Sequence, residues 1–251
     1  MSRKVLGITL ENKTKKNILD KIIKNIASPM GFFHIVSLNP ENLVVAQENA
    51  EFERALNDAQ IRIVDGFGIV LVSRILHIEA GERVTGINLM QTLVDTASKM
   101  RLKVLLIGGR PNLALRLAEC YSKKYPEANF LGVEGVAGIQ NPKKEEEEEI
   151  FSIVLDYKPN LVFVAFGSPF QELWLSQHKD RFKNMVCMGV GGAFDSISGS
   201  VPRAPLIIQR MGLEWVFRLF VQPWRWRRQL RLFIFIFLIL KERVGLSTKS
   251  Y

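Results

Sequence analysis

Short apolar runs recur along the first 200 residues, separated by longer segments of mixed polarity. The runs are nearly continuous in Val, Ile, Leu and Phe and do not alternate with polar residues, which is typical of strands buried on both faces of a parallel sheet. This pattern predicts strands at residues 4–10, 33–38, 61–64, 103–107, 130–133, 161–165 and 185–190.

The segments between these runs carry apolar residues at helical spacing. They predict helices at residues 14–26, 40–57, 67–76, 85–100, 111–124, 142–157 and 169–178. Asn39 is suited to cap the second helix, with Pro40 at its first position. Strands that alternate with helices in this way predict an α/β, Rossmann-like fold, in which helices flank a mostly parallel sheet.

The last fifth of the chain has a different character. Residues 203–251 hold ten Lys and Arg against two Glu, a formal charge of +8 out of +9 for the whole chain. Pro202, Pro205 and the turn at 198–200 mark the boundary. We therefore predict an α/β domain over 1–202 and a basic, apolar helical appendage over 203–251, divided into two helices at Pro223.

This charge asymmetry indicates an anionic partner, either nucleic acid or a membrane surface. The appendage also contains three of the four tryptophans and the apolar run 232–240, which a nucleic-acid-binding arm would not need. Nine helical residues rise only about 13 Å, against roughly 30 Å of hydrocarbon, so the run fits the membrane interface rather than a span. In the alternative interpretation, the run packs on the body of the protein or mediates association into a homo-oligomer.

The N-terminal residues lack the apolar core of a signal peptide. Cys120 and Cys187 lie in apolar contexts and are expected to be small core residues in a reducing compartment. We expect a cytoplasmic protein, held at the inner face of the cell membrane by its appendage.

In an open parallel sheet, ligands bind beyond the carboxyl ends of the strands. The polar and glycine-rich positions at these ends are Ser37, Asn39, Asp65, 108–110, 167–171 and 191–195. Each of them also has an ordinary structural explanation, because Asp-Gly and Gly-Gly are common in turns.

Several standard sites are absent from the sequence. It has neither the glycine spacing of a dinucleotide site nor a phosphate-binding P-loop, and its three histidines lack metal-ligand spacing. Its seven aspartates include no Asp-x-Asp pair. We expect no metal and no cofactor, so arginines would have to neutralise a bound diphosphate, and Arg218, Arg225 and Arg228 are suitably placed.

Five motifs together resemble the WecG/TagA/CpsF family of bacterial glycosyltransferases. They are VDGFG at 64–68, ERVTG at 82–86, GSPFQE at 167–172, GGAFD at 191–195 followed by Gly199 and RAP at 203–205, and EWVFR at 214–218. Their order and spacing match over about residues 5–232. The sequence departs from the family at Ser37, where threonine is more usual, and at Phe67, where a small aliphatic residue is common.

The resemblance, closest to TagA-type members, implies a metal-independent, inverting enzyme of wall teichoic acid synthesis. Such an enzyme moves N-acetylmannosamine from UDP-N-acetylmannosamine to the 4-hydroxyl of N-acetylglucosamine on undecaprenyl diphosphate. By this resemblance, Asp65 is the general base. The resemblance also assigns substrate binding to Ser37, Asn39, Arg83 and Gln171 around the sugars, Asp195 at the nucleotide, and Arg218, Arg225 and Arg228 at the diphosphate.

Three alternatives stay open at this point. The first is a different donor within the same family, since relatives use a mannosaminuronic acid or other sugars. A nucleic-acid-binding module would explain the basic tail but gives Asp65, Arg83 and Gln171 no role, so we expect no nucleic acid partner. A nicotinamide-dependent oxidoreductase fits the α/β pattern but lacks the glycine fingerprint.

Overall fold

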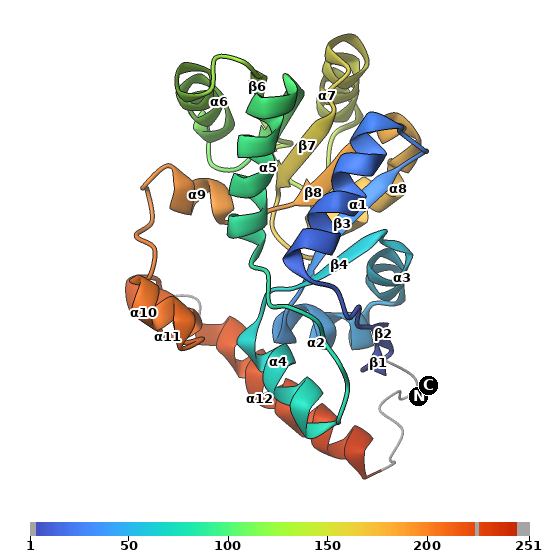
Figure 1. The fold of residues 1–251 in the computed structure, drawn as a ribbon, viewed down its shortest axis with the longest axis vertical. Coiled ribbons are helices and arrows are strands. Elements are labelled where there is room, and N and C mark those ends of the chain that lie inside the picture. The colour runs from blue at the N-terminus through green and yellow to red at the C-terminus, as the bar shows by residue number, and fades with distance from the viewer. Residues whose placement is uncertain (1–3, 224–225, 245–251) are drawn as a thin grey trace.

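Six parallel strands in the order β4-β3-β8-β7-β5-β6 form the centre of the protein (Figure 1). The computed structural model describes residues 4–223 and 226–244, without the side chains of residues 210 and 227–229. The strands are β3 (Phe33–Leu38), β4 (Ile61–Val64), β5 (Lys103–Gly108), β6 (Asn129–Val133), β7 (Leu161–Ala165) and β8 (Val186–Gly189). The predicted α/β fold with a parallel sheet is confirmed.

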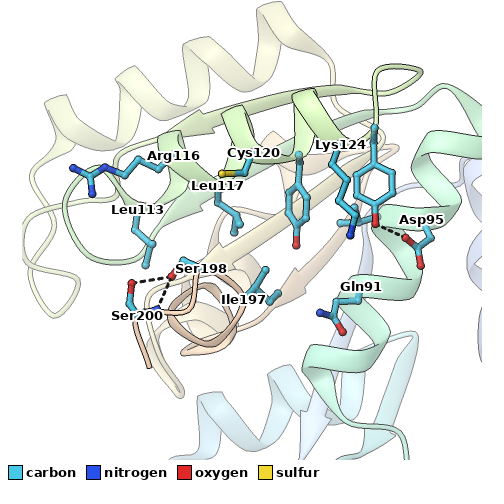
Figure 2. A pocket seen from close by; sticks show the side chains of 13 residues that line it. Gln91, Asp95, Leu113, Arg116, Leu117, Cys120, Lys124, Ile197, Ser198 and Ser200 are labelled. Carbon is cyan, nitrogen blue, oxygen red and sulfur yellow. Dashed lines mark hydrogen bonds between the residues drawn. The ribbon is translucent and has the colours of Figure 1, made fainter. Parts of the chain in front are cut away.

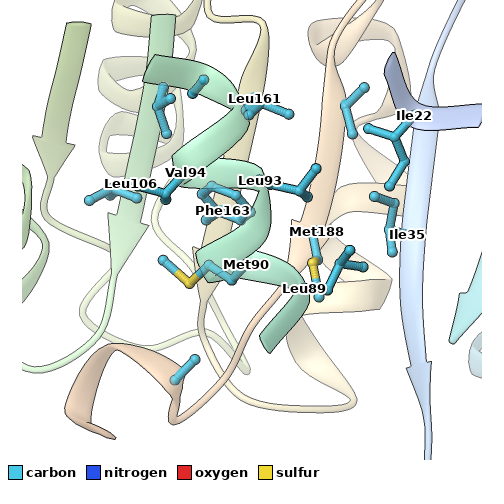
Figure 3. Close-up of a cluster of buried hydrophobic side chains, with 14 of the residues drawn as sticks. Ile22, Ile35, Leu89, Met90, Leu93, Val94, Leu106, Leu161, Phe163 and Met188 are labelled. Atoms are coloured by element: carbon cyan, nitrogen blue, oxygen red, sulfur yellow. The ribbon is translucent and has the colours of Figure 1, made fainter. Parts of the chain in front are cut away.

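Helices cover both faces of this sheet. Alternate strand residues point to opposite sides, so Ile35 and Leu106 belong to one apolar core, whereas Val36 and Leu105 belong to cores on the other side. The first core is covered by α1 (Lys15–Ala27), α5 (Gly86–Met100), α6 (Leu113–Lys124) and α9 (Ala193–Ile197), and Figure 3 shows α5 across the strands. The other side is covered by α2 (Pro40–Glu48), α3 (Ala50–Asp58), α4 (Phe67–Ile75), α7 (Lys144–Tyr157), α8 (Phe170–Gln177) and the 3-10 turn η1 (Lys179–Phe182).

The predicted strand at 4–10 is wrong, because this segment folds back on itself. Strands β1 (Lys4–Val5) and β2 (Ile8–Thr9) pair antiparallel and do not join the six-stranded sheet. Leu6 and Gly7 form the turn with φ of 49° and 77°, a conformation that glycine adopts without steric cost. The hairpin buries Val5, Leu6 and Ile8 in the core beneath α2 and α3.

The single helix predicted at 40–57 is also wrong, because Asn49 divides it into α2 and α3. Asn49 has extended backbone angles, and its side-chain oxygen accepts a hydrogen bond of 2.9 Å from the Phe52 N–H. Asparagine readily forms such local bonds, which compete with a continuous helix. The helical spacing of the apolar residues on both sides concealed this break.

The appendage forms α10 (Leu206–Arg210), α11 (Glu214–Val221) and α12 (Trp226–Arg243). The predicted division around Pro223 is confirmed, whereas α10 was not predicted. One face of α12 packs on the body: Phe235 and Ile239 are 1% and 4% exposed and share a core with residues of α2 and α4. At its two ends, Arg231 forms a 2.9 Å ion pair with Glu41, and the Glu242 carboxylate accepts a hydrogen bond from the Leu6 N–H.

The opposite face of α12 is apolar and open to solvent. Phe233 is 69% exposed and Phe237 is 65% exposed. The run 232–240 therefore packs on the body with one side only, and its other side lacks a covering layer within the described chain. Over the ranges 4–223 and 226–244, the helices are all too short or too polar to cross a membrane.

Two phenylalanines on α12 provide a test of this orientation. We expect Phe235→Ala to lower the free energy of unfolding by about 3–5 kcal/mol, because it leaves a cavity in the core beneath α12. Phe237 lies on the exposed face, so Phe237→Ala should change the free energy of unfolding by no more than about 0.5 kcal/mol. Chemical denaturation of both variants measures the difference, and equal losses would contradict the observed packing.

Candidate active site

The polar residues predicted at strand ends lie along one edge of the sheet. Strands β4, β3, β8, β7 and β5 are consecutive neighbours and run in parallel, so their carboxyl ends face the same way. In this order the edge carries Asp65, Ser37 and the loops at 190–192, 166–169 and 108–110. The site predicted from the sequence therefore forms a continuous row along this edge.

Asp65 lies between the end of β4 and the start of α4. Its backbone N–H and that of Gly66 both donate to the Leu38 carbonyl, at 2.9 and 3.3 Å, which ties the end of β4 to the end of β3. A Cβ at position 66 would lie 2.7 Å from Pro40 Cδ, so glycine permits α2 to begin directly against this turn. The Asp-Gly pair thus combines a rigid backbone with a carboxylate at the strand ends.

The Asp65 carboxylate faces the N-terminus of α5. Its Oδ2 accepts a hydrogen bond of 3.0 Å from the Gly86 N–H, the first residue of that helix. A Cβ at Gly86 would lie 3.4 Å from Asp65 Oδ2 and 3.1 Å from Ser37 Oγ. The carboxylate and the hydroxyl therefore converge on the same point, and the absent side chain of Gly86 leaves room between them.

The surroundings of Asp65 shift its proton affinity. Burial raises the pKa of this carboxyl above its ordinary value, and the charge of Glu214 adds to the rise. The Gly86 N–H, Arg218 and Arg83 act in the opposite direction, each favouring the ionised form. A carboxylate that is partly desolvated and held by one donor is a stronger base than an exposed aspartate.

Arg83 connects Asp65 to the appendage. Its Nε donates to the Asp65 carbonyl at 3.1 Å, and its Nη1 donates to the Gln209 carbonyl of α10, also at 3.1 Å. Next to it, the Val84 N–H donates to the Val64 carbonyl at 2.9 Å, which extends the edge of the sheet by one bridge. The guanidinium predicted to contact a sugar is thus held beside the general-base candidate.

Arg218 on α11 lies within electrostatic range of Asp65. It pairs with Glu214 one helical turn earlier, and the charges of both residues alter the pKa of Asp65. Arg203, at the start of the appendage, donates to Asn88 Oδ1 on α5 at 2.7 Å. Two other predicted arginines are not tested, because Arg225 and the side chain of Arg228 lie outside the described residues.

Asn39 caps α2 as predicted from the sequence. Its Oδ1 accepts a 2.9 Å hydrogen bond from the Asn42 N–H. Asn42 is 3% exposed and continues the network, because its Nδ2 donates to the Ser37 carbonyl at 2.8 Å and its Oδ1 accepts from Ser168 Oγ at 3.1 Å. Asn42 therefore holds the end of β3 to the loop after β7.

Gln171 uses its buried amide to join two loops. Its Oε1 accepts hydrogen bonds from the Gly167 N–H at 3.1 Å and the Gly191 N–H at 2.9 Å, while its Nε2 donates to Glu172 at 2.8 Å. A Cβ at Gly189 would lie 2.6 Å from this amide, so the side chain packs directly on the end of β8. These contacts give Gln171 a positioning role beneath the strand ends.

Asp195 lies in the first turn of α9 and forms a 2.9 Å ion pair with Arg110 Nε. Arg110 follows Gly108 and Gly109, which adopt φ of 85° and 88°. The pair joins the loop after β5 to the loop after β8, at the opposite end of the row from Asp65. More than half of the Arg110 side chain is exposed, so its charge faces the solvent-accessible side of this loop pair.

Sequence reasoning missed Asn42 and Glu172 as parts of this network, and it named Arg110 at a strand end without its partner Asp195. Glu172 is 1% exposed, and burial raises the pKa of its carboxyl. A polar side chain in the first turn of a helix at a strand end is a weak signal that could have identified Asn42. Glu172 stands within the GSPFQE motif, yet its partner, the Gln171 amide, became evident only from the fold.

A cavity of about 650 Å³ lies away from this row, between α5, α6 and α9 (Figure 2). Its walls include Asp95, Cys120, Lys124 and Ser198, and none of the predicted site residues that the structure describes lines it.

Cys120 is exposed, so its predicted core position is wrong, whereas Cys187 is buried as predicted. Within the described part of the chain, no three His, Cys, Asp or Glu residues are grouped as a metal site would require.

Comparison with known proteins confirms the predicted family. Residues 3–249 match the Glycosyl transferase WecG/TagA/CpsF family. An N-acetylglucosaminyldiphosphoundecaprenol N-acetyl-beta-D-mannosaminyltransferase of Bacillus spizizenii is 32% identical over 217 residues, which are 86% of this chain and 82% of that protein. Proteins of the same name from Bacillus subtilis and Staphylococcus aureus are 29% and 28% identical, over 85% and 89% of this chain and 81% and 85% of their own lengths.

The match extends over both the α/β body and the appendage, and includes every residue placed at the strand ends. The relative from Bacillus spizizenii exceeds 30% identity over most of both chains. The chain therefore belongs to the WecG/TagA/CpsF family of glycosyltransferases.

Proposed function

We propose that this glycosyltransferase moves N-acetylmannosamine from UDP-N-acetylmannosamine to N-acetylglucosamine carried on undecaprenyl diphosphate. The product is a β-1,4-linked disaccharide on the lipid, an early intermediate of wall teichoic acid synthesis. The names of the relatives support these substrates, because each describes an N-acetylmannosamine transfer to this acceptor.

The observation that carries the proposal is the placement of the Asp65 carboxylate at the Gly86 N–H, with the Ser37 hydroxyl also close to Gly86. A sugar hydroxyl is a weak nucleophile until a positioned base accepts its proton. In the proposed reaction, Asp65 takes the proton of the acceptor 4-hydroxyl. The oxygen of that hydroxyl forms a bond to the anomeric carbon of the donor. The bond from that carbon to UDP breaks, and the configuration inverts.

The departing UDP takes the electron pair and gains negative charge. We assign the neutralisation of this charge to arginines rather than to a metal. Arg218 is the described candidate because its charge already acts on Asp65, and Arg225 and Arg228 remain predictions from the sequence. Preorganised guanidinium groups stabilise such a charge in a site that excludes water.

We further propose that the enzyme acts at the cytoplasmic face of the cell membrane, where a lipid-linked acceptor would be available. The formal charge of +8 over residues 203–251 favours anionic headgroups. The exposed Phe233 and Phe237 of α12 supply apolar surface beside that charge. Self-association of this face is the competing explanation, and the oligomeric state in the absence of lipid distinguishes the two.

A donor panel tests the reaction. The purified protein is incubated with a short-chain lipid-diphosphate N-acetylglucosamine and a chelator. Four donors are tested one at a time: UDP-N-acetylmannosamine, UDP-N-acetylmannosaminuronic acid, UDP-N-acetylglucosamine and UDP-glucose. Mass spectrometry of the products should show one added sugar with UDP-N-acetylmannosamine, in the absence of divalent metal. Transfer of the uronic acid instead would reassign the donor, and activity restored only by Mg²⁺ would contradict the role given to the arginines.

The pH dependence follows from the shifted pKa of Asp65. The base must be ionised to accept a proton, so kcat/KM should fall as pH decreases through the pKa of Asp65 in the free enzyme. Because burial raises this pKa, the acidic limb should lie above the ordinary aspartate value of about 3.9. A profile that stays flat down to about pH 4 would contradict the assignment of Asp65 as a desolvated base.

A further inference from the structure

Helix α4, in the α/β body, exposes an apolar stripe of its own. Phe67, Leu71 and Ile75 are 41%, 49% and 39% exposed. They are spaced by four residues, so they share one face of the helix. On the other side, Ile69 and Val72 are buried in the core, and α4 is therefore apolar on both its covered and its open face.

This stripe adjoins the appendage although more than 130 residues separate them in sequence. A Cβ at Gly212, between α10 and α11, would lie 2.4 Å from the Phe67 ring, so this turn packs on Phe67. A Cβ at Gly68 would lie 3.9 Å from Leu232 of α12. Figure 1 shows α4 next to α12, at the end of the molecule opposite α6 and α7.

Exposed apolar residues continue from α4 onto each helix of the appendage. Ile207 on α10 is 72% exposed and Phe220 on α11 is 80% exposed, and they accompany the open face of α12. Soluble monomers rarely expose several large apolar side chains on adjoining elements. Arg74 lies exposed between Leu71 and Ile75 in the sequence of α4, so basic and apolar side chains occur together there as well.

We propose that α4 is a second membrane-contact element and that the lipid-binding surface consists of α4 together with α10, α11 and α12. The occupant is the surface of an anionic phospholipid bilayer, which matches both the apolar side chains and the basic charge of this end of the molecule. This inference rests on the proposed function, since a lipid-linked acceptor requires the enzyme to work at a bilayer.

The position of α4 gives this contact a consequence for the reaction. The helix starts two residues after Asp65, and the turn between them is tied to β3 through the Leu38 carbonyl. Contact of α4 with lipid therefore sets the depth of Asp65 relative to the headgroups.

The test replaces the outer residues of the stripe with serine, which removes apolar surface without adding charge. The double variant Leu71→Ser/Ile75→Ser is compared with Leu155→Ser, whose leucine is 69% exposed on α7 at the other end of the molecule. Binding is measured by co-sedimentation with vesicles of phosphatidylcholine and phosphatidylglycerol, and with phosphatidylcholine alone. We expect the double variant to bind anionic vesicles about tenfold more weakly and the control to bind like the wild type.

Two further readouts make each outcome decisive. Thermal denaturation and transfer to a short-chain, water-soluble acceptor should be unchanged in the double variant, since both residues are exposed and lie outside the proposed machinery. Wild-type vesicle binding by a folded double variant overturns the proposal. The proposal is also overturned if the double variant and the wild type differ in oligomeric state on size-exclusion chromatography. The stripe would then be a contact between copies of the protein. Failure of the proposed function would appear separately, as absence of transfer by the wild type.

Discussion

Replacing Asp65 with asparagine should lower kcat/KM by about 10²- to 10⁴-fold, the usual contribution of a positioned general base. The asparagine oxygen can still accept the hydrogen bond from the Gly86 N–H, so the turn after β4 should keep its geometry. Affinity for UDP should therefore change little. Steady-state kinetics with the short-chain acceptor, together with calorimetric titration of UDP, measure the two effects.

The same substitution should not reduce stability. The fold raises the pKa of Asp65, so the ionised carboxylate is less favourable in the folded than in the unfolded protein at neutral pH. Asparagine removes that unfavourable charge, and the Tm at pH 7 should equal or exceed that of the wild type. A variant that loses both activity and several degrees of Tm would indicate a structural rather than a catalytic role for the carboxylate.

Arg218→Ala should lower kcat by about 10²- to 10³-fold, the range found when one preorganised donor to a developing anion is removed. The loss has two physical sources. The leaving diphosphate loses a guanidinium, and Asp65 loses a nearby positive charge that lowers its pKa, so that pKa rises. The acidic limb of the pH profile should therefore move upward in this variant.

Two companion variants separate specific from general charge effects. Arg218→Lys keeps the charge but loses the planar fork and should recover only part of the activity. Arg243→Ala removes an exposed arginine at the far end of α12 and should leave kcat with a soluble acceptor unchanged. An equal loss for Arg218→Ala and Arg243→Ala would argue against a direct role for Arg218 at the diphosphate.

The sheet and the row of strand ends could be predicted because parallel strands have a simple signature. Each strand is a continuous apolar run, and its last residues and the one that follows fall at the same edge of the sheet, so Ser37 and Asp65 could be predicted to lie at one edge. The strand order, which sets the sequence of Asp65, Ser37 and the three loops along the row, required the fold. Periodicity alone does not determine which strands are neighbours.

The failures share a physical cause, the local preference of single residues. Gly7 reverses the chain within a segment that has the sequence pattern of one strand. Asn49 caps a second helix within a segment that has the sequence pattern of one continuous helix. The contacts of Gln171 could not be predicted either, because its side-chain oxygen accepts hydrogen bonds from the N–H groups of two different loops. Its place around the sugars stays a prediction. An amide at a strand end has the same sequence signature whether it binds a sugar or holds the loops beneath it.

The contact between Leu6 and Glu242 has a consequence for biosynthesis. The ribosome makes the hairpin and α2 long before α12, so a nascent chain exposes the apolar surface that Phe235 covers until α12 has been synthesised. Helix α12 must then dock on segments that precede it by more than 170 residues. Chains that terminate upstream of α12 should therefore be more prone to aggregate than the chain that includes it.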